Sequence, residues 1–481
     1  MKKHTDVSIN LSLTKKKCMP MINTWGCILA TASVIFCLNI SDREHSNMLH
    51  KPSLLLLLCS LCSTYVAANQ DVEQQIVQHV DTQLDGSTAL LIQLVNINSG
   101  TMNFAGVKQV GMLLKQKYDA LGFTTEWLDG NTFGRAGHLI ATYESTSHPD
   151  AAKILLIGHL DTVFAKDDDF QTITKLANGH IAGPGMTDMK GGDVIMLASL
   201  QALQKQGLLQ QLNIKVVMTG DEESSGKPLS LSKQAIIDAA IWADIALGFE
   251  DGDSNINTAV TSRRGSVNWS LTVKGKPAHS SQIFTDENGD GAIFETARIL
   301  NEFRVQLQHE KLLSFNPGVI AGGTRVTQQD DKSNFSAFGK TNVIAKDTLV
   351  KGGIRAVSPE QLKRAKVIMQ KIVSQSLRHT SAVLEFHPGY PPMGQTPGNL
   401  DLLALYSQVS EDLGYELIVA VNPRNAGAAD ISFAASHVDM SLDGLGLMGS
   451  GGHTKDEVAD MSSFVKNIQK TAILIYRLSQ Q

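Results

Sequence analysis

Two short polar motifs, each placed where an apolar run ends, could carry hydrolytic chemistry. His159 and Asp161 follow the run that ends at Ile157, and the acidic triplet Asp221-Glu222-Glu223 follows a second run. Side chains two residues apart on an extended backbone point the same way, so Asp161 could orient the imidazole of His159 as a metal ligand. Adjacent carboxylates repel one another unless a cation or a proton relieves them. Either motif alone is more often an ordinary strand-end turn.

Three further motifs carry the same residue types. Asp188 lies in a glycine-rich segment before an expected helix, Glu250 follows a short apolar run, and His453 follows a glycine-rich turn. The alternative for Asp188 is an ordinary capped helix with a flexible entry loop. Nitrogen and oxygen ligands without sulfur fit zinc, cobalt or manganese hydrolytic sites. Five such motifs on one chain therefore predict a shared metal site.

The patterns around these motifs alternate between strands and helices. We expect strands at 124–128, 138–143, 154–157, 214–219 and 245–249, and helices at 72–80, 88–96, 104–121, 193–206, 235–244 and 399–413. This alternation predicts an α/β fold, a mixed-sheet catalytic domain with helical layers. In open α/β sheets, ligands bind at the carboxyl ends of the strands, which is where the motifs fall.

The pattern changes near residue 265. Alternating apolar and polar residues predict an antiparallel strand at 266–274, and later segments continue the domain: a helix at 291–309, strands at 318–327, 341–344 and 348–357, and a helix at 359–377. This order predicts an inserted α+β (ferredoxin-like) domain with an open sheet edge. The expected divisions are a leader at 1–68, a catalytic domain formed by two segments at 69–263 and 386–481, and between them the inserted domain at 264–385.

Composition and the N-terminal segment bound the class of protein. The chain has 481 residues and a formal net charge of -5, which argues against nucleic acid as a partner. The segment from Met48 onward has the pattern of a signal peptide (48–68) that is cleaved near Ala68. We therefore expect Met48 to be the true start of translation and residues 1–47 not to belong to the protein. The alternative is a membrane anchor at 25–40. All five cysteines precede Asn69. We therefore expect a periplasmic or secreted protein with no thiol and no stable membrane association after cleavage.

The ordered motifs resemble those of the M20 family of co-catalytic zinc peptidases and deacylases, above all its glutamate carboxypeptidase (carboxypeptidase G2-like) branch. The likeness covers roughly residues 70–481. It implies two divalent metal ions, zinc first and cobalt or manganese as alternatives. One would be bound by His159 and Glu250, the other by Glu223 and His453, and both by Asp188.

The same resemblance assigns roles around the metals. Glu222 would be the general base, Asp161 would orient His159, and a cis peptide would join Asp188 to Met189. The resemblance also makes the inserted domain at 264–385 a lid and dimerisation domain. There, His279 would reach a partner subunit's active site in a homodimer and stabilise the oxyanion.

Three residues are expected to bind substrate. Asn342 and Arg355 resemble the grip that the family's lid places on a substrate carboxylate; for Arg355, a strand-edge surface arginine is the alternative. Asp430 ends a loop that lines the pocket in relatives, although this chain has fewer glycines there. Glutamate-specific relatives carry a further arginine near the end of the lid, where 386–391 has none, so selectivity for glutamate does not carry over.

These inferences predict a metallo-exopeptidase that cleaves the amide bond next to a C-terminal amino acid in a peptide or N-acyl amino acid. An N-acyl amino acid deacylase or dipeptidase of the same family would use the same residues. From a different class, the chain could be an inactive homologue that binds metal or peptide, but such relatives commonly lose a ligand or the base, and this chain retains them all.

Overall fold

The computed structural model describes residues 51–177, 179–329 and 334–480. The chain divides into two compact units, the second running from Gln70 to Gln480. Helix α2 (Lys51–Val95) is continuous, so the prediction of two separate helices within 72–96 is wrong. Among the described residues, no helix combines the length and apolarity needed to cross a bilayer. The proposed start at Met48 and the alternative anchor at 25–40 lie outside the described residues.

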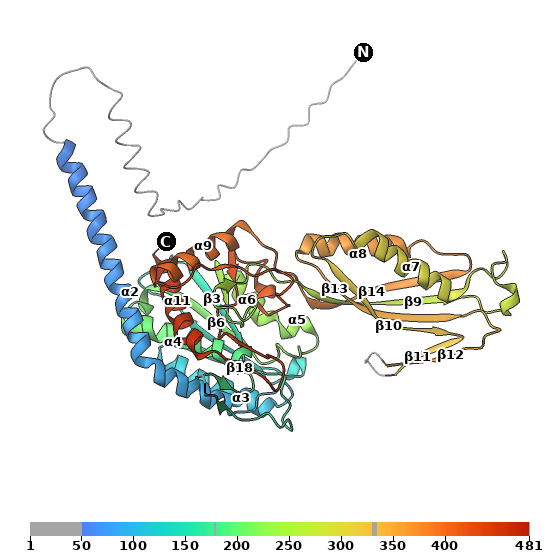
Figure 1. The fold of residues 1–481 in the computed structure, drawn as a ribbon, viewed down its shortest axis with the longest axis horizontal. Coiled ribbons are helices and arrows are strands. Elements are labelled where there is room, and N and C mark those ends of the chain that lie inside the picture. The colour runs from blue at the N-terminus through green and yellow to red at the C-terminus, as the bar shows by residue number, and fades with distance from the viewer. Residues whose placement is uncertain (1–50, 178, 330–333, 481) are drawn as a thin grey trace, which may run out of the picture. The chain divides into compact units, whose positions relative to one another are not determined.

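A six-stranded mixed sheet forms the centre of the second unit (Figure 1). Its order is β1 (Thr124–Asp129), β2 (Gly137–Tyr143), β6 (Asn213–Thr219), β3 (Lys153–His159), β7 (Ile245–Gly248) and β16 (Met440–Leu442). Strand β3 pairs in parallel with β6 and with β7, whereas β1 and β2 are antiparallel. The carboxyl ends of β3, β6 and β7 therefore meet at one edge, as the apolar runs predicted.

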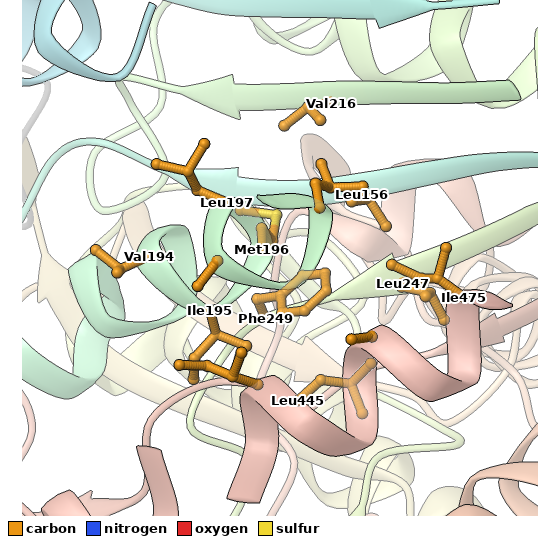
Figure 2. Packing of buried hydrophobic residues seen from close by; sticks show 14 of the residues in the cluster. Leu156, Val194, Ile195, Met196, Leu197, Val216, Leu247, Phe249, Leu445 and Ile475 are labelled. Carbon is orange, nitrogen blue, oxygen red and sulfur yellow. The ribbon is translucent and has the colours of Figure 1, made fainter. Parts of the chain in front are cut away.

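Helices cover both faces of this sheet. They are α3 (Phe104–Ala120), α4 (Gly191–Lys205), α6 (Gln234–Trp242), α9 (Pro397–Asp412) and α11 (Met461–Ser479). Successive residues of β3 point to opposite faces. Leu156 therefore joins the larger core, and Leu155 joins a smaller core against α6. Figure 2 shows Leu156 in the larger core, with Met196 of α4 and Ile475 of α11.

The inserted domain has its own sheet and core. Strands β10 (Ser314–Gly323), β13 (Asp347–Arg355), β9 (Ser266–Gly275) and β14 (Thr380–Tyr390) are antiparallel and neighbours in that order. Helices α7 (Gly291–Leu307) and α8 (Pro359–Val373) lie on one face of this sheet (Figure 1). Trp269 and Phe303 pack edge to face at 6.0 Å within its separate core. This strand order is the ferredoxin-like arrangement that the sequence predicted.

Three details of this domain differ from expectation. The strand expected at 341–344 is a turn with one isolated bridge, at Val343. The expected strand at 318–327 is divided between β10 and a hairpin of β11 (Arg325–Gln329) and β12 (Asn334–Phe338). Strand β14 was not predicted, because the Pro and Gly near its end are typical of a connector.

The remaining described elements are short. They are η1 (Asn131–Phe133), β4 (Thr174–Lys175), β5 (Ile181–Ala182), η2 (Met186–Lys190), η3 (Leu209–Gln211), α5 (Leu229–Ser232), β8 (Thr258–Ala259), η4 (Ser280–Gln282), β15 (Val419–Ala420), α10 (Ile431–Ala434), β17 (Gly449–Ser450) and β18 (Val458–Ala459).

Candidate metal centre

The structure brings all five predicted ligands to the carboxyl edge of the larger sheet. They form two groups that share Asp188. In the first group, the Nε2 of His159 lies 3.0 Å from Asp188 Oδ1 and 3.7 Å from Glu250 Oε1. In the second, the Nε2 of His453 lies 2.7 Å from Asp188 Oδ2 and 3.3 Å from Glu223 Oε2. One carboxylate thus faces both imidazoles, which is the geometry of a bridging ligand.

The electrostatics of the cluster fit a pair of cations. Burial raises the pKa of Glu223 to about 9, and the nearby Asp188 adds to the effect. Burial also raises the pKa of Glu250. The Oε1 of Glu223 is buried without a hydrogen-bond partner. Carboxylates crowded in this way repel one another unless a cation compensates them, and their oxygens with two imidazole nitrogens suit a divalent metal.

The loop that carries Asp188 is fixed by a residue that the sequence analysis missed. The buried carboxylate of Glu457 accepts hydrogen bonds from the main-chain N–H groups of Gly185 at 2.9 Å and Thr187 at 2.8 Å. The peptide between Asp188 and Met189 is cis, as the family resemblance implied. Glu457 comes shortly after His453 in the chain, so one segment supplies a ligand and also holds the bridging loop.

Asp161 organises the histidine and the acidic loop together. The Nδ1 of His159 donates to the main-chain oxygen of Asp161 at 3.0 Å and lies 3.5 Å from its carboxylate, which leaves Nε2 free for a metal. The Asp161 carboxylate accepts from Thr101 Oγ1 at 2.6 Å and from the N–H groups of Glu222 and Glu223 at 3.0 and 3.2 Å. Its role is therefore wider than orienting one imidazole.

Glu222 has the environment expected of a general base. Burial raises the pKa of Glu222 to about 8; Asp430 adds to the rise and His159 opposes it. Glu222 directly precedes Glu223, one of the predicted metal ligands.

A buried ion-pair network lies behind the acidic loop. Lys233, 1% exposed, contacts the carboxylates of Asp221 and Asp430, each at 2.9 Å. Asp430 also accepts a hydrogen bond from Thr219 Oγ1 at 2.5 Å, and the hydroxyl of Tyr390 lies 3.1 Å from its carboxylate. The carboxylate predicted to contact substrate thus has three partners within the protein. Lys233 and Tyr390 were missed, because no local pattern in the sequence marks a buried Lys–Asp pair.

Two predicted residues of the inserted domain, His279 and Asn342, make contacts within that domain. His279 is exposed, its Nδ1 lies 2.9 Å from Ser281 Oγ, and its backbone bridges to Val343. Asn342 is exposed and adjoins it, because its carbonyl accepts from the N–H of Ser280 at 2.9 Å. Among the described residues, neither side chain has a hydrogen bond or ion pair with a predicted ligand. Their catalytic and substrate roles stay predictions.

Arg355 belongs to a group of three arginines, of which the sequence analysis named only this one. It ends β13 opposite Ser314, whose Oγ accepts from Arg264 Nη1 at 3.2 Å. Arg264 Nη2 donates to the main-chain oxygen of Arg424 at 3.2 Å. Burial lowers the pKa of Arg264, and the charges of Arg355 and Arg424 lower it further. Within the described ranges, no ion pair joins these three arginines to a carboxylate.

A neighbouring arginine connects this group to a ligand. Arg263 Nε donates to Asp443 Oδ2 at 2.7 Å, and Asp443 Oδ1 accepts from the N–H of Glu250 at 3.3 Å. Arg263 Nη1 also donates to the main-chain oxygen of Gly427, in the loop between Arg424 and Asp430. Arg263 directly precedes Arg264, so the group of three arginines is connected to the main chain of Glu250 through Arg263 and Asp443.

Comparison with known proteins agrees with this geometry. A model of Peptidase family M20/M25/M40 matches residues 155–478. Carboxypeptidase G2 from Pseudomonas sp. (strain RS-16) is 22% identical over 436 residues, which cover 89% of this chain and 98% of that protein. A probable succinyl-diaminopimelate desuccinylase from Staphylococcus epidermidis is 29% identical over 167 residues, 34% of this chain and 40% of that protein. The structure of aminopeptidase PepT from Bacillus cereus has a TM-score of 0.63 at 19% identity and covers 82% of this chain and 98% of its own.

The fold and the paired ligand groups define a hydrolase of peptide or amide bonds from a metal-dependent family. The chain belongs to Peptidase family M20/M25/M40.

Proposed function

We propose that the protein is a carboxypeptidase that cleaves the amide bond next to a C-terminal amino acid. The observation that carries this proposal is the group of Arg264, Arg355 and Arg424, which adjoins Arg263 and, through Asp443, the main chain of Glu250. A guanidinium presents a planar fork of donors that matches a carboxylate, and grouped cations favour an anionic ligand. A free C-terminal carboxylate bound there would place the adjacent amide toward the metal ligands.

Individual residues of the chain would carry out the remaining steps of catalysis. Glu222 takes a proton from the attacking water and returns it to the leaving amine, so that protons balance over one turnover. Asp161 holds the main chain of Glu222 and the imidazole of His159 in fixed positions relative to each other. The two metals, which we propose to be zinc with cobalt or manganese as substitutes, would supply Lewis-acid activation of the carbonyl and the water.

Assembly and location complete the proposal. We propose a homodimer through the inserted domain, in which His279 of the partner subunit stabilises the oxyanion beside Glu222. We also propose export to the periplasm or the exterior after cleavage near Ala68. Analytical ultracentrifugation tests the dimer, and N-terminal sequencing of the exported protein tests the cleavage site.

A substrate pair tests the function. An N-acyl dipeptide with a free C-terminal carboxylate should be cleaved by the zinc-loaded protein with a kcat/KM at least about 100-fold above that of its C-terminal amide, because each ionic contact contributes on the order of 1.5–3 kcal/mol. Glu222→Gln should retain zinc and lose turnover by about 100-fold or more. Equal cleavage of acid and amide would reject the carboxypeptidase assignment.

The same assay distinguishes a carboxypeptidase from the alternative functions. The partial similarity to a probable desuccinylase favours inclusion of N-succinyl and other N-acyl amino acids in the panel. Preferential cleavage of these compounds over N-acyl dipeptides would establish a deacylase, and preference for unblocked dipeptides would establish a dipeptidase. Tight peptide binding without cleavage by any preparation would establish an inactive homologue.

A further inference from the structure

Tyr390 joins the return strand of the inserted domain to the acidic loop. It is the last residue of β14, and its hydroxyl lies 3.0 Å from the main-chain oxygen of Glu222. The same hydroxyl lies 3.1 Å from Asp430 Oδ1 and 3.1 Å from Ser225 Oγ. Its ring packs edge-on against Phe433 at 4.9 Å. One side chain thus contacts the loop of the proposed base, the buried ion-pair network and the hydrophobic core.

The hydrogen-bonding capacity of these groups decides how they are arranged. The carbonyl of Glu222 and the carboxylate of Asp430 only accept, whereas the hydroxyl of Ser225 can donate to Tyr390. Tyrosine has a single proton to share between the two acceptors. Asp430 already accepts from Thr219 and contacts Lys233, so it is satisfied without that proton. The Tyr390 proton is therefore available to the carbonyl of Glu222.

The peptide units on both sides of Glu222 are consequently held. Its N–H donates to Asp161 at 3.0 Å, and its carbonyl accepts from Tyr390 at 3.0 Å. These two hydrogen bonds restrict the main chain of Glu222 and so limit the positions that its carboxylate can take. Tyr390 belongs to the inserted-domain segment, whereas Asp161 follows β3, so the two restraints come from different regions of the fold.

The position of Tyr390 in β14 also connects this contact to strand β9. After a shift in register past His387, Tyr390 pairs with Ser266, the first residue of β9. The strand that enters the inserted domain and the strand that leaves it therefore meet at this residue. A movement of either strand would therefore reach the carbonyl of Glu222 through the Tyr390 hydroxyl.

We propose that Tyr390 is a positioning residue, whose hydroxyl sets the main chain of Glu222 for proton transfer and couples it to the inserted domain. This inference rests on the proposed role of Glu222 as the base. The tyrosine hydroxyl contacts Glu222, Asp430 and Ser225, none of which is a predicted metal ligand, so its removal should affect turnover more than metal binding.

Tyr390→Phe tests the inference in the zinc-loaded protein. With an N-acyl dipeptide substrate, kcat should fall about 10- to 100-fold while KM changes less than about twofold, because a small displacement of a catalytic group slows the chemical step. Zinc content should stay at the wild-type value. The matched control is Tyr415→Phe, which removes a hydroxyl bonded to Gln469 elsewhere in the fold and should leave kcat unchanged.

A second variant keeps the test decisive if Tyr390→Phe folds poorly. Thr219→Val removes one donor from Asp430, so the Tyr390 proton moves to that carboxylate and kcat should fall. The double variant should lose no more activity than Tyr390→Phe alone, because both changes act through one hydroxyl. A fully additive double variant, or a kcat for Tyr390→Phe equal to that of Tyr415→Phe, would overturn the inference. Full activity in Glu222→Gln would instead overturn the proposed function.

Discussion

The carboxylate of Asp161 accepts a hydrogen bond from the main-chain N–H of Glu222 at 3.0 Å. The same residue accepts from the Nδ1 of His159 through its carbonyl. A buried acid therefore holds a metal ligand and the proposed base to one another, and a change at this position should disturb metal affinity and turnover together.

Asp161→Asn should lower metal affinity about 10- to 100-fold, because groups that orient a ligand contribute that much to binding. The amide replaces one acceptor oxygen by a donor, so one of the two N–H groups of Glu222 and Glu223 loses its partner. At saturating zinc, kcat should therefore still be reduced. Competition with a chelator and steady-state kinetics measure the two effects. Thr101→Val is the control, since it removes a contact of Asp161 but keeps the carboxylate. Wild-type metal affinity in Asp161→Asn would contradict the role.

Metal removal and return should change stability as well as activity. Binding to the folded state alone stabilises it by about 4 kcal/mol when the free ligand exceeds its dissociation constant about 1,000-fold. The chelator-treated protein should therefore unfold at a lower temperature and recover with zinc. Metal analysis should give two ions per chain, one for His453→Ala and none for Asp188→Ala. His437→Ala, an exposed histidine, should retain both. Two ions in Asp188→Ala would refute a shared ligand.

Arg355→Gln should reduce kcat/KM for substrates with a free C-terminal carboxylate by about 10- to 100-fold, because it removes a charged hydrogen bond. The C-terminal amide should be affected little. Arg364→Gln removes an exposed arginine of α8 and serves as the charge-matched control. Equal losses on acid and amide would assign Arg355 a structural role.

The stability of the protein should depend on pH through Lys470. Burial lowers the pKa of Lys470 to about 7, and the charge of Lys466 contributes. Between pH 7 and the ordinary lysine value of about 10.5, the unfolded chain binds a proton that the folded chain does not, so the free energy of unfolding rises with pH in this window. Lys470→Met should remove this contribution to the slope and raise stability most at or below pH 7.

Unfolding of the chelator-treated protein at several pH values measures this effect. The exposed Lys117→Met is the control and should keep the wild-type slope. A Lys470→Met protein with the wild-type pH dependence would show that Lys470 keeps its proton in the folded state.

The local residue pattern predicted those helices and strands whose formation depends on residues close together in the sequence. The apolar runs before His159, Glu222 and Glu250 predicted buried parallel strands, because such strands have both faces covered. Helix α2 was divided in two because Gly86 weakens a helical pattern by about 1 kcal/mol, a cost that packing along the helix offsets. Strand β14 was missed because Pro388 is typical of a connector.

The site was predictable only where a motif marked it. Asp188 and His453 are far apart in sequence; their motifs predicted a shared metal site, and the family resemblance assigned the ion that each would bind. Lys233 and Arg264 act through partners from distant segments, so nothing in their own neighbourhoods distinguishes them from surface residues. Long-range pairs of this kind appear only when the chain is folded.

Four of the five ligands precede the inserted domain, and His453 follows it. During synthesis the three residues of the first group leave the ribosome before the imidazole of the second. Glu457, which holds the Asp188 loop, is made later still, so a stop between Glu250 and His453 would leave both groups without that support. Assembly of the proposed centre therefore depends on the segment that carries His453 and Glu457.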